Sequence, residues 1–280
     1  MDKSVQAQKV ALLKKLHEGP RILVLANAWD PISARIVEEI GFPAVATTSA
    51  GIAATLGYPD GQRVSRDEML EVVGRVARAV QVPVTADMEA GYGTTPKAMA
   101  ETALALIAAG AVGLNLEDVT GDDESSHVEL QLQLEKIRAI RDASAAAGVP
   151  LVINARTDVY LMPIGLVETR FERTVDRLRA YAKAGADCVF APAVKDAQTI
   201  AKLVKAVEAP LNILLMPGAP NLNELEKLGV ARASIGSGLM RASLGTARNV
   251  AKTLFDRHDS DAIFSDAVPY AEVNRLLDRD

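Results

Sequence analysis

The stretch AAGAVGLNLED, residues 108–118, contains the pattern on which the fold prediction rests. A helix-forming segment runs into Gly110, and glycine tolerates the left-handed conformation that ends many helices. A short apolar run without alternation follows, which is typical of a strand buried on both faces. The same unit recurs at four other places, EEIGFPAVATT (38–48), AAAGVPLVINAR (145–156), AKAGADCVFAPA (182–193) and EKLGVARASIGS (226–237).

Three further apolar runs, at 22–27, 82–87 and 211–216, bring the expected strands to about eight. Helical segments lie between them, and one begins with a capping box of Ser65 and Glu68. Strands that alternate with helices predict a parallel sheet, and eight of them predict an α/β fold of the (β/α)8 TIM-barrel type. The alternative is an open doubly wound sheet, which would usually have fewer strands and a Gly-rich first turn. The segment LANAWDP, residues 25–31, has no such turn.

The chain of 280 residues fits a single (β/α)8-barrel domain over 1–280. No linker or low-complexity segment divides it. Residues 238–280 lie beyond the eighth expected strand, and their pattern predicts extra C-terminal helices. We expect this extension to pack on the barrel or to reach a neighbouring subunit.

Composition and charge narrow the possible classes of function. Apolar residues make up 49% of the chain and aromatic residues 4%, so the core must consist of Ala, Val, Leu and Ile. The formal net charge of −5, without a Lys/Arg run, argues against a nucleic-acid partner. No apolar run approaches the ~20 residues that span a bilayer, and the N-terminus lacks a signal-peptide pattern, so no membrane partner and a cytoplasmic location are expected. Cys188 is the single cysteine, which excludes an internal disulfide and a zinc–cysteine cluster.

Acidic side chains gather where the expected strands end. The carboxyl ends of barrel strands meet at one face, where such barrels carry their chemistry. We therefore expect four carboxylates and one guanidinium to converge on one mouth, namely Asp60, Asp87, Glu89, Glu117 and Arg156. Unpaired carboxylates are costly to bury, and a hard divalent cation would resolve their repulsion.

Mg²⁺ fits such a site because it prefers oxygen ligands, keeps several waters and needs only one or two direct carboxylates. Mn²⁺ is a possible substitute, because it suits the same ligands. The strand ends contain neither His nor Cys, which disfavours zinc. The alternative is that these carboxylates are solvated or pair with Lys and Arg.

Two further features could bind an anion. Arg156 can hold a substrate carboxylate with its planar fork of donors, although a salt bridge to Asp158 or Glu117 is an equal alternative. In the segment TTSAGIA, residues 47–53, successive small residues could present backbone N–H groups to an anion. A plain transition from strand to loop is the alternative there.

Together these residues resemble the isocitrate lyase/phosphoenolpyruvate mutase superfamily, including its phosphonomutase-like and methylisocitrate lyase-like members. The strongest marker is D-x-[DE]-x-G-[YF]-G, here DMEAGYG at residues 87–93. It is backed in order by TTSAG, LGYPD, LED, NARTD, GAD and LNIL, and the match covers roughly residues 25–241.

The resemblance implies a (β/α)8 barrel that binds Mg²⁺ and a 2-oxo acid or enolate at its mouth. Asp87 would ligate the metal directly, while Glu89 and Glu117 would hold its waters. The implied substrate contacts are Ser49, Ala50, Gly51, Asp60, Arg156 and Asn212, with Asp60 as the acid at the edge of the metal. The family also commonly swaps a C-terminal helix between subunits, which implies a homo-oligomer, a dimer or tetramer.

The segment after the fourth expected strand departs from the family. Lyases of the family resemble one another in a Lys-Lys-Cys-Gly-His loop whose cysteine gives a proton to the enolate, whereas VTGDDESSHVEL, residues 119–130, has no cysteine. His127 lies in this segment and is a candidate replacement acid, because histidine titrates near neutrality. A surface histidine before a helix is the alternative and the more common case. Cys188 is expected in the core, and His17 and His258 on the surface.

Three functions are therefore to be compared. The first is a Mg²⁺-dependent carbon–carbon lyase or decarboxylase, similar to methylisocitrate lyase or oxaloacetate decarboxylase, that acts on a small 2-oxo or 2-hydroxy di- or tricarboxylate through an enolate. The second is phosphonate chemistry, mutase or hydrolase action on a phosphonopyruvate-like compound, which the acidic loop disfavours by repelling a dianion. The third is a 2-oxo acid binding protein with little turnover, because the usual acid is missing.

Overall fold

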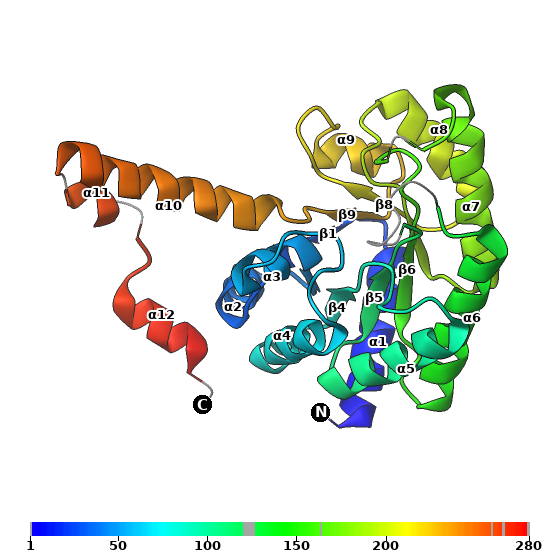
Figure 1. Cartoon of the computed structure of the whole chain (residues 1–280), viewed down its shortest axis with the longest axis horizontal. Helices are drawn as coiled ribbons and strands as arrows, with labels where there is room; N and C mark the ends of the chain where they lie inside the picture. Colours follow the sequence, from blue (N-terminus) through cyan, green and yellow to red (C-terminus); the bar gives the residue numbers. More distant parts are fainter. Residues whose placement is uncertain (1, 120–126, 163, 259, 265–266, 279–280) are drawn as a thin grey trace.

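The computed structural model describes residues 2–119, 127–162, 164–258, 260–264 and 267–278. Nine parallel strands form one sheet in the order β1-β9-β8-β7-β6-β5-β4-β3-β2. The two end strands, β1 (Leu23–Leu25) and β2 (Asn27–Ala28), are consecutive in the chain and separated only by Ala26. The sheet therefore nearly closes on itself, and the expected (β/α)8 barrel is confirmed (Figure 1). The first expected strand is divided into two, which is why nine strands are present instead of eight.

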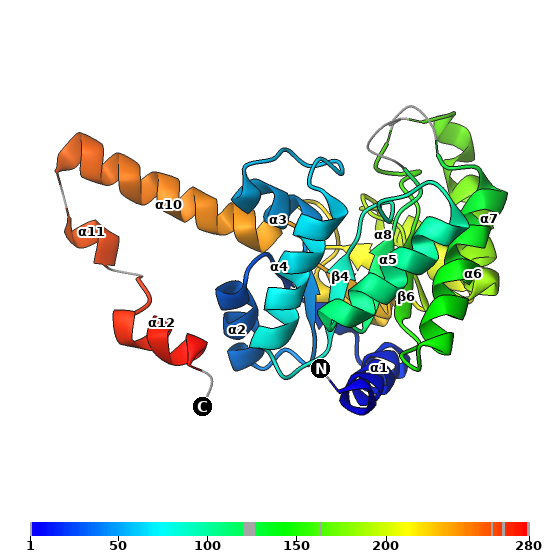
Figure 2. The same ribbon diagram turned by 60° about the horizontal axis from the view of Figure 1, so that its bottom comes forward.

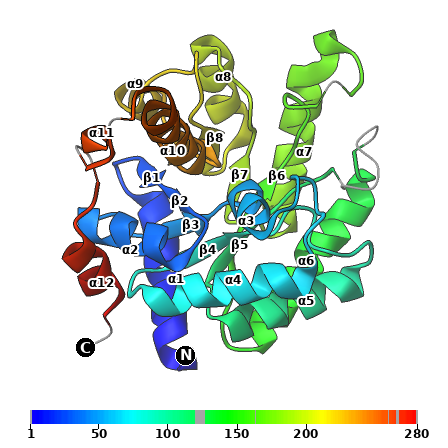
Figure 3. The same ribbon diagram turned by 60° about the vertical axis from the view of Figure 1, so that its left-hand side comes forward.

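The remaining elements follow the alternation expected from the repeats. The other strands are β3 (Val45–Thr47), β4 (Val84–Asp87), β5 (Gly113–Leu116), β6 (Val152–Arg156), β7 (Cys188–Phe190), β8 (Leu211–Leu214) and β9 (Arg232–Ser234). The helices between them are α2 (Pro31–Ile40), α3 (Ser49–Leu56), α4 (Arg66–Ala79), α5 (Pro96–Ala109), α6 (Leu130–Ala146), α7 (Arg170–Ala184), α8 (Ala197–Val207) and α9 (Leu222–Lys227), with a 3₁₀ turn at Val167–Thr169. Figure 3 shows these helices around the strands.

The predicted helix ends are confirmed. Gly110 follows α5 with a φ of +99°, and the other four glycines of the repeats, Gly41, Gly148, Gly185 and Gly229, also have positive φ. At the start of α4, the Glu68 N–H donates to Ser65 Oγ and the Ser65 N–H donates to the Glu68 carboxylate, which is the expected capping box.

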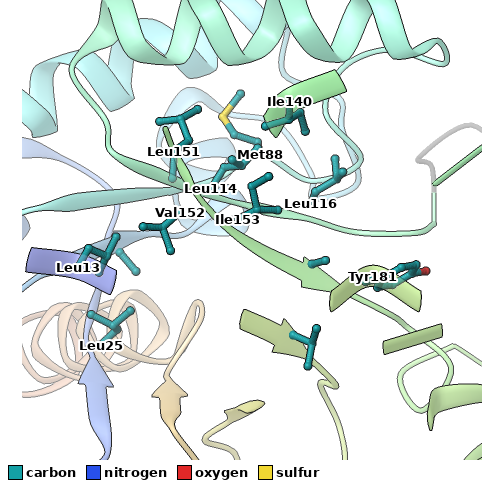
Figure 4. Close-up of a cluster of buried hydrophobic side chains, with 14 of the residues drawn as sticks. Leu13, Leu25, Met88, Leu114, Leu116, Ile140, Leu151, Val152, Ile153 and Tyr181 are labelled. Atoms are coloured by element: carbon teal, nitrogen blue, oxygen red, sulfur yellow. The ribbon is translucent and has the colours of Figure 1, made fainter. Parts of the chain in front are cut away.

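The core consists of aliphatic side chains on the strands and the inner helix faces, as the low aromatic content predicts. Leu114, Leu116 and Ile153 are fully buried, and Met88 and Tyr181 belong to the same core cluster (Figure 4). Cys188 is buried on β7, so its predicted place in the core is confirmed.

The N-terminal helix α1 (Lys3–Glu18) packs against the N-terminal end of the barrel. The Gln6 amide donates to the carbonyls of Ile107 and Ala111, and Leu13 lies against Gly113 at the start of β5. His17 is 6% exposed, so the predicted surface position was wrong. The reason is that α1 turns an apolar stripe toward the strands, and position 17 lies four residues after Leu13 on the same helix face.

The expected C-terminal extension consists of α10 (Gly238–Arg257), α11 (Asp261–Phe264) and α12 (Tyr270–Leu277). The long helix α10 runs outward from the barrel, and the chain then returns (Figures 1 and 2). There α12 packs on α2, where Arg35 Nε donates to the Leu276 carbonyl at 2.6 Å and Arg275 pairs with Glu39. Of the helices in the described ranges, none is long and apolar enough to cross a membrane.

Candidate active site

The acidic segment DMEAGYG turns sharply at the carboxyl end of β4. Glu89 and Tyr92 have φ angles of +49° and +59°, which residues other than glycine rarely adopt. At Gly91, with φ +92°, a Cβ atom would lie 2.4 Å from Met99 Sδ. Glycine is therefore required there by both conformation and space. Such strained backbone is commonly found at functional sites.

Asp87 ends β4, and several donors hold its carboxylate. Ser49 donates to Oδ2 through its backbone N–H at 3.1 Å and its hydroxyl at 2.8 Å. Asn115 Nδ2 donates to Oδ1 at 3.2 Å. These contacts join the start of α3 and strand β5 to the predicted metal ligand.

Glu89 lies almost fully buried beside the other acids. It is 4% exposed, and the Tyr92 hydroxyl donates to its Oε1 at 2.8 Å. The pKa of Glu89 is raised to about 7, mainly by burial and also by the negative charges of Asp87 and Asp60, while the Tyr92 hydrogen bond acts in the opposite direction. Acidic residues from two loops and one strand end thus share one electrostatic environment, as expected.

Arg156, at the end of β6, is held by two carboxylates. Its Nε and Nη2 donate to Asp158 at 2.6 and 2.8 Å, and its Nη1 pairs with Glu117 at 2.7 Å. The salt-bridge alternative considered for Arg156 is therefore present in both of its forms. Burial raises the pKa of Glu117 well above its ordinary value, with Arg156 opposing the shift and Asp158 adding to it.

A cavity of about 190 Å³ lies between these groups. Its lining residues are Ser49, Asp60, Gly61, Glu89, Glu117, Val119, Arg156, Asp158, Leu161 and Met162. The three acids Asp60, Glu89 and Glu117 thus meet Arg156 and Ser49 at one mouth, as the strand ends predict. Asp87 lies next to this cavity, in contact with Ser49, and is not one of its lining residues.

Of the other predicted substrate contacts, Ser49 lines the cavity, whereas Ala50, Gly51 and Asn212 do not. Ser49, Ala50 and Gly51 form the first turn of α3 instead of a plain loop. Two of their N–H groups have protein partners, because Ser49 donates to Asp87 and Gly51 donates to Thr48 Oγ1. Asn212 is fully buried on β8, where its Oδ1 accepts from Ser234, and it does not line the cavity.

His127 lies outside the cavity lining. Its Nδ1 is 3.3 Å from Arg173 Nη2 on α7, and its Nε2 is buried with no hydrogen-bond partner in the described structure. Burial lowers the pKa of His127, which favours the neutral imidazole at pH 7. The residues just before it, 120–126, lie outside the described ranges.

Asp118 supports the site through its hydrogen bonds and was not identified from the sequence as a functional residue. Its fully buried carboxylate accepts from Thr157 Oγ1, the Asp158 N–H, Arg177 Nε and the Tyr181 hydroxyl. Asp118 thereby fixes the backbone of the residue that holds Arg156. The only signal in the sequence was its place after Glu117 at a strand end.

The donor set fits a hydrated Mg²⁺. The acidic side chains near the cavity offer only oxygen ligands, and burial, with a smaller contribution from the neighbouring acids, raises the pKa values of Glu89 and Glu117. No three His, Cys, Asp or Glu side chains in the described ranges lie close enough to be direct ligands of one ion.

Comparison with known proteins places the chain in a family. The family model for phosphoenolpyruvate phosphomutase matches residues 13–255. The chain belongs to this family. It is therefore a member of the isocitrate lyase/phosphoenolpyruvate mutase superfamily, as its motifs indicated.

Relatives of this family member cover most of its length. The uncharacterized protein Rv1998c of Mycobacterium tuberculosis is 34% identical over 264 residues, covering 94% of this chain and 95% of that protein. Oxaloacetate decarboxylase 2 of Pseudomonas fluorescens is 33% identical over 226 residues, covering 79% and 74%. A crystal structure from Burkholderia cenocepacia, provisionally named a lyase/mutase, is 37% identical with a TM-score of 0.89 and covers 97% and 96%.

Proposed function

We propose that this protein is a Mg²⁺-dependent lyase or decarboxylase that breaks a carbon–carbon bond of a small 2-oxo or 2-hydroxy di- or tricarboxylate through an enolate. The observation that carries the proposal is the cavity at the barrel mouth, where Asp60, Glu89 and Glu117 meet Arg156. The 33% identity to an oxaloacetate decarboxylase supports the same class of reaction.

The carboxylates and Ser49 have distinct parts in this proposal. Breaking a bond beside a carbonyl leaves negative charge on an enolate oxygen, and a bound Mg²⁺ would stabilise that charge as it develops. Asp87 would ligate the ion directly, with Glu89 and Glu117 holding its waters. Ser49 orients Asp87 through two hydrogen bonds, so the ligand needs little rearrangement when the ion binds.

Arg156 would bind a carboxylate of the substrate. Each of its three nitrogens already donates one N–H to Asp158 or Glu117, which leaves one N–H on Nη1 and one on Nη2 for the substrate. Asp158 holds the guanidinium with two bonds and Glu117 with one. We therefore propose that a substrate carboxylate accepts from the N–H groups that remain on Nη1 and Nη2, while Asp158 and Glu117 keep Arg156 in orientation.

The proposal is tested with purified protein, Mg²⁺ and a panel of oxaloacetate, 2-methylisocitrate and 2,3-dimethylmalate. Formation of a shorter 2-oxo acid or of carbon dioxide is expected from at least one of them. Asp87→Asn should abolish both turnover and Mg²⁺ binding. The exposed Asp142→Asn on α6 is the matched control and should behave like the wild type. Equal turnover by Asp87→Asn would contradict the assignment.

The two other functions give different results in the same assay. Phosphate release from phosphonopyruvate would favour phosphonate chemistry, which the family name and a Burkholderia structure provisionally named a phosphonomutase, at 39% identity, keep in view. Metal-dependent binding of oxalate without turnover of any diacid would favour a 2-oxo acid binding protein.

His127 is the candidate acid that the sequence offered for the enolate, but its place outside the cavity lining and its contact with Arg173 favour the alternative of a histidine without a catalytic part. One variant decides between the two. A general acid typically contributes 10²- to 10⁴-fold, so His127→Ala should lower kcat by about that factor if the imidazole delivers the proton. A wild-type rate would remove His127 from the mechanism and leave it as a partner of Arg173.

A further inference from the structure

Arg232 is a charged side chain enclosed inside the barrel. It lies on β9 and is 0% exposed. Its Nη2 donates to Asn115 Oδ1 on β5 at 3.3 Å. Three strands separate β9 from β5 in the sheet, so this contact crosses the barrel interior. The guanidinium therefore lies inside the ring of strands, below the mouth.

The positive charge of Arg232 has no direct counter-ion. No carboxylate of the described residues forms an ion pair with it, and its Nε and Nη1 have no hydrogen-bond partner there. Arginine keeps its proton under physiological conditions, so the charge is permanent. A buried charge without compensation is strongly unfavourable, which means that more distant negative charges must stabilise it.

Asp87 is the acid to which Arg232 is connected. The side-chain oxygen of Asn115 accepts from Arg232 and, at 2.8 Å, from Asn154 Nδ2. The Nδ2 atom of Asn115 donates to Asp87 Oδ1 at 3.2 Å. One amide thus links the guanidinium to the predicted metal ligand. Burial lowers the pKa of Arg232, while Cys188 and, less strongly, Asp87 raise it. The two charges therefore interact across Asn115.

We propose that Arg232 is the fixed counter-charge of the carboxylate site formed by Asp60, Asp87, Glu89 and Glu117. From inside the barrel it weakens the binding of a divalent cation and strengthens the binding of an anionic substrate. It is a positioning residue, because it reaches the site only through Asn115. This inference rests on the proposed function, since it assumes that a cation and an anion bind at the mouth.

A charge effect has a distinctive signature. Removing a positive charge makes the site more negative, so cation binding becomes tighter and anion binding weaker. A merely structural role would give a different result, because a loosened site would bind both ligands more weakly. Unit charges several ångströms apart, at an effective dielectric constant near 20, change equilibrium constants by about tenfold or more.

The experiment is calorimetric titration of the full-length protein, first with Mn²⁺ alone and then with oxalate at saturating Mn²⁺. Arg232→Met should lower the dissociation constant of Mn²⁺ about tenfold and raise that of oxalate by a similar factor. Arg232→Lys keeps the charge and should leave both constants within about threefold of wild type. Lys136→Met removes another buried cation, on α6 outside the strands, and should change neither.

The possible outcomes separate the inference from the proposed function. If the wild type binds no Mn²⁺, the proposed function fails. If the wild type binds Mn²⁺ but Arg232→Met changes neither constant, or weakens both, the counter-charge role is overturned. Should Arg232→Met fail to fold, Arg232→Gln is the second uncharged variant, and thermal melting identifies which variants are folded. The same opposite shifts are expected from it.

Discussion

Gly91 lies at the turn between Glu89 and Tyr92, and its hydrogen atom takes the place of a side chain. A Cβ there would meet Met99 Sδ at 2.4 Å and Leu116 Cδ1 at 3.0 Å, and the φ of +92° would strain any other residue. The two acids of DMEAGYG are therefore presented by a backbone that glycine makes possible. The strained backbone of this segment costs stability and holds Glu89 in a fixed position.

Gly91→Ala is expected to lower the free energy of unfolding by about 2–4 kcal/mol, because it adds backbone strain and overpacks the core. Urea unfolding followed by circular dichroism measures the change. Gly245→Ala in α10 is the matched control, since nothing lies within 4 Å of its added methyl group. That variant should be neutral or up to about 1 kcal/mol more stable. Equal effects at both positions would contradict the steric explanation.

Asp118 shows the same dependence on a single side chain, here through charge. Asp118→Asn would leave the Arg177 guanidinium without its buried partner and should cost about 3–5 kcal/mol of stability. Tyr181→Phe removes one hydrogen bond to the same carboxylate and should cost only about 1–2 kcal/mol. Chemical unfolding of both variants tests this order. A larger loss for Tyr181→Phe would mean that the ion pair does not dominate the network.

At the scale of the element, α1 contributes more than a cover for the barrel. His17 Nδ1 lies 2.7 Å from the Leu13 carbonyl, and Nε2 is buried without a partner in the described residues. Burial, together with the positive charge of Arg232, lowers the pKa of His17 to about 4. The helix is therefore anchored by a histidine that must stay neutral.

This gives a prediction for the pH dependence of stability. Since the folded-state pKa of about 4 lies below the ordinary 6.5, the unfolded chain takes up the proton first. The contribution of His17 is fully present above pH 6.5 and is lost as the pH falls toward 4, by about 3 kcal/mol in total. His17→Leu should remove this part of the slope when unfolding is measured between pH 7 and 4.5. Parallel curves for wild type and variant would show that His17 does not titrate with unfolding.

At the scale of the whole molecule, the C-terminal arm α10 extends from the barrel (Figure 1), and it carries exposed apolar side chains. Leu244 is 53% exposed and Phe255 is 82% exposed. Such side chains on a projecting helix suit a contact with another subunit. Exchange of the arm between subunits, in a dimer or tetramer, remains a proposal that follows from family membership.

Light scattering of the purified chain is expected to give a mass of two or four chains. Phe255→Asp should shift that mass toward a single chain, because it places a charge in the predicted subunit contact. Arg257→Asp, two residues along α10, is the matched control for a new acidic side chain on the same helix. A monomeric wild type would contradict the proposal at once.

Much of the architecture could be predicted because it depends only on the direction in which each strand runs. Five units in which a glycine ends a helix, including EEIGFPAVATT and AKAGADCVFAPA, predict the helix ends and the buried strands that follow them. The carboxyl ends of parallel barrel strands must then lie at one face. The sharing of one mouth by Glu89, Glu117 and Arg156 follows from that direction. The split of the first strand at Ala26 does not follow, because it depends on hydrogen bonds with two different neighbours.

The amino-acid sequence by itself thus determined the barrel, its acidic mouth and its family. Only the tertiary structure decided which charges are paired and which are not. Arg156 is held by Asp158 and Glu117, whereas Arg232 is enclosed inside the strands without an ion pair among the described residues. Asp118 meets Tyr181 across 63 positions of the chain. A repeat pattern states which way a strand points, whereas a contact depends on packing across the barrel, where partners distant in sequence come within hydrogen-bonding reach.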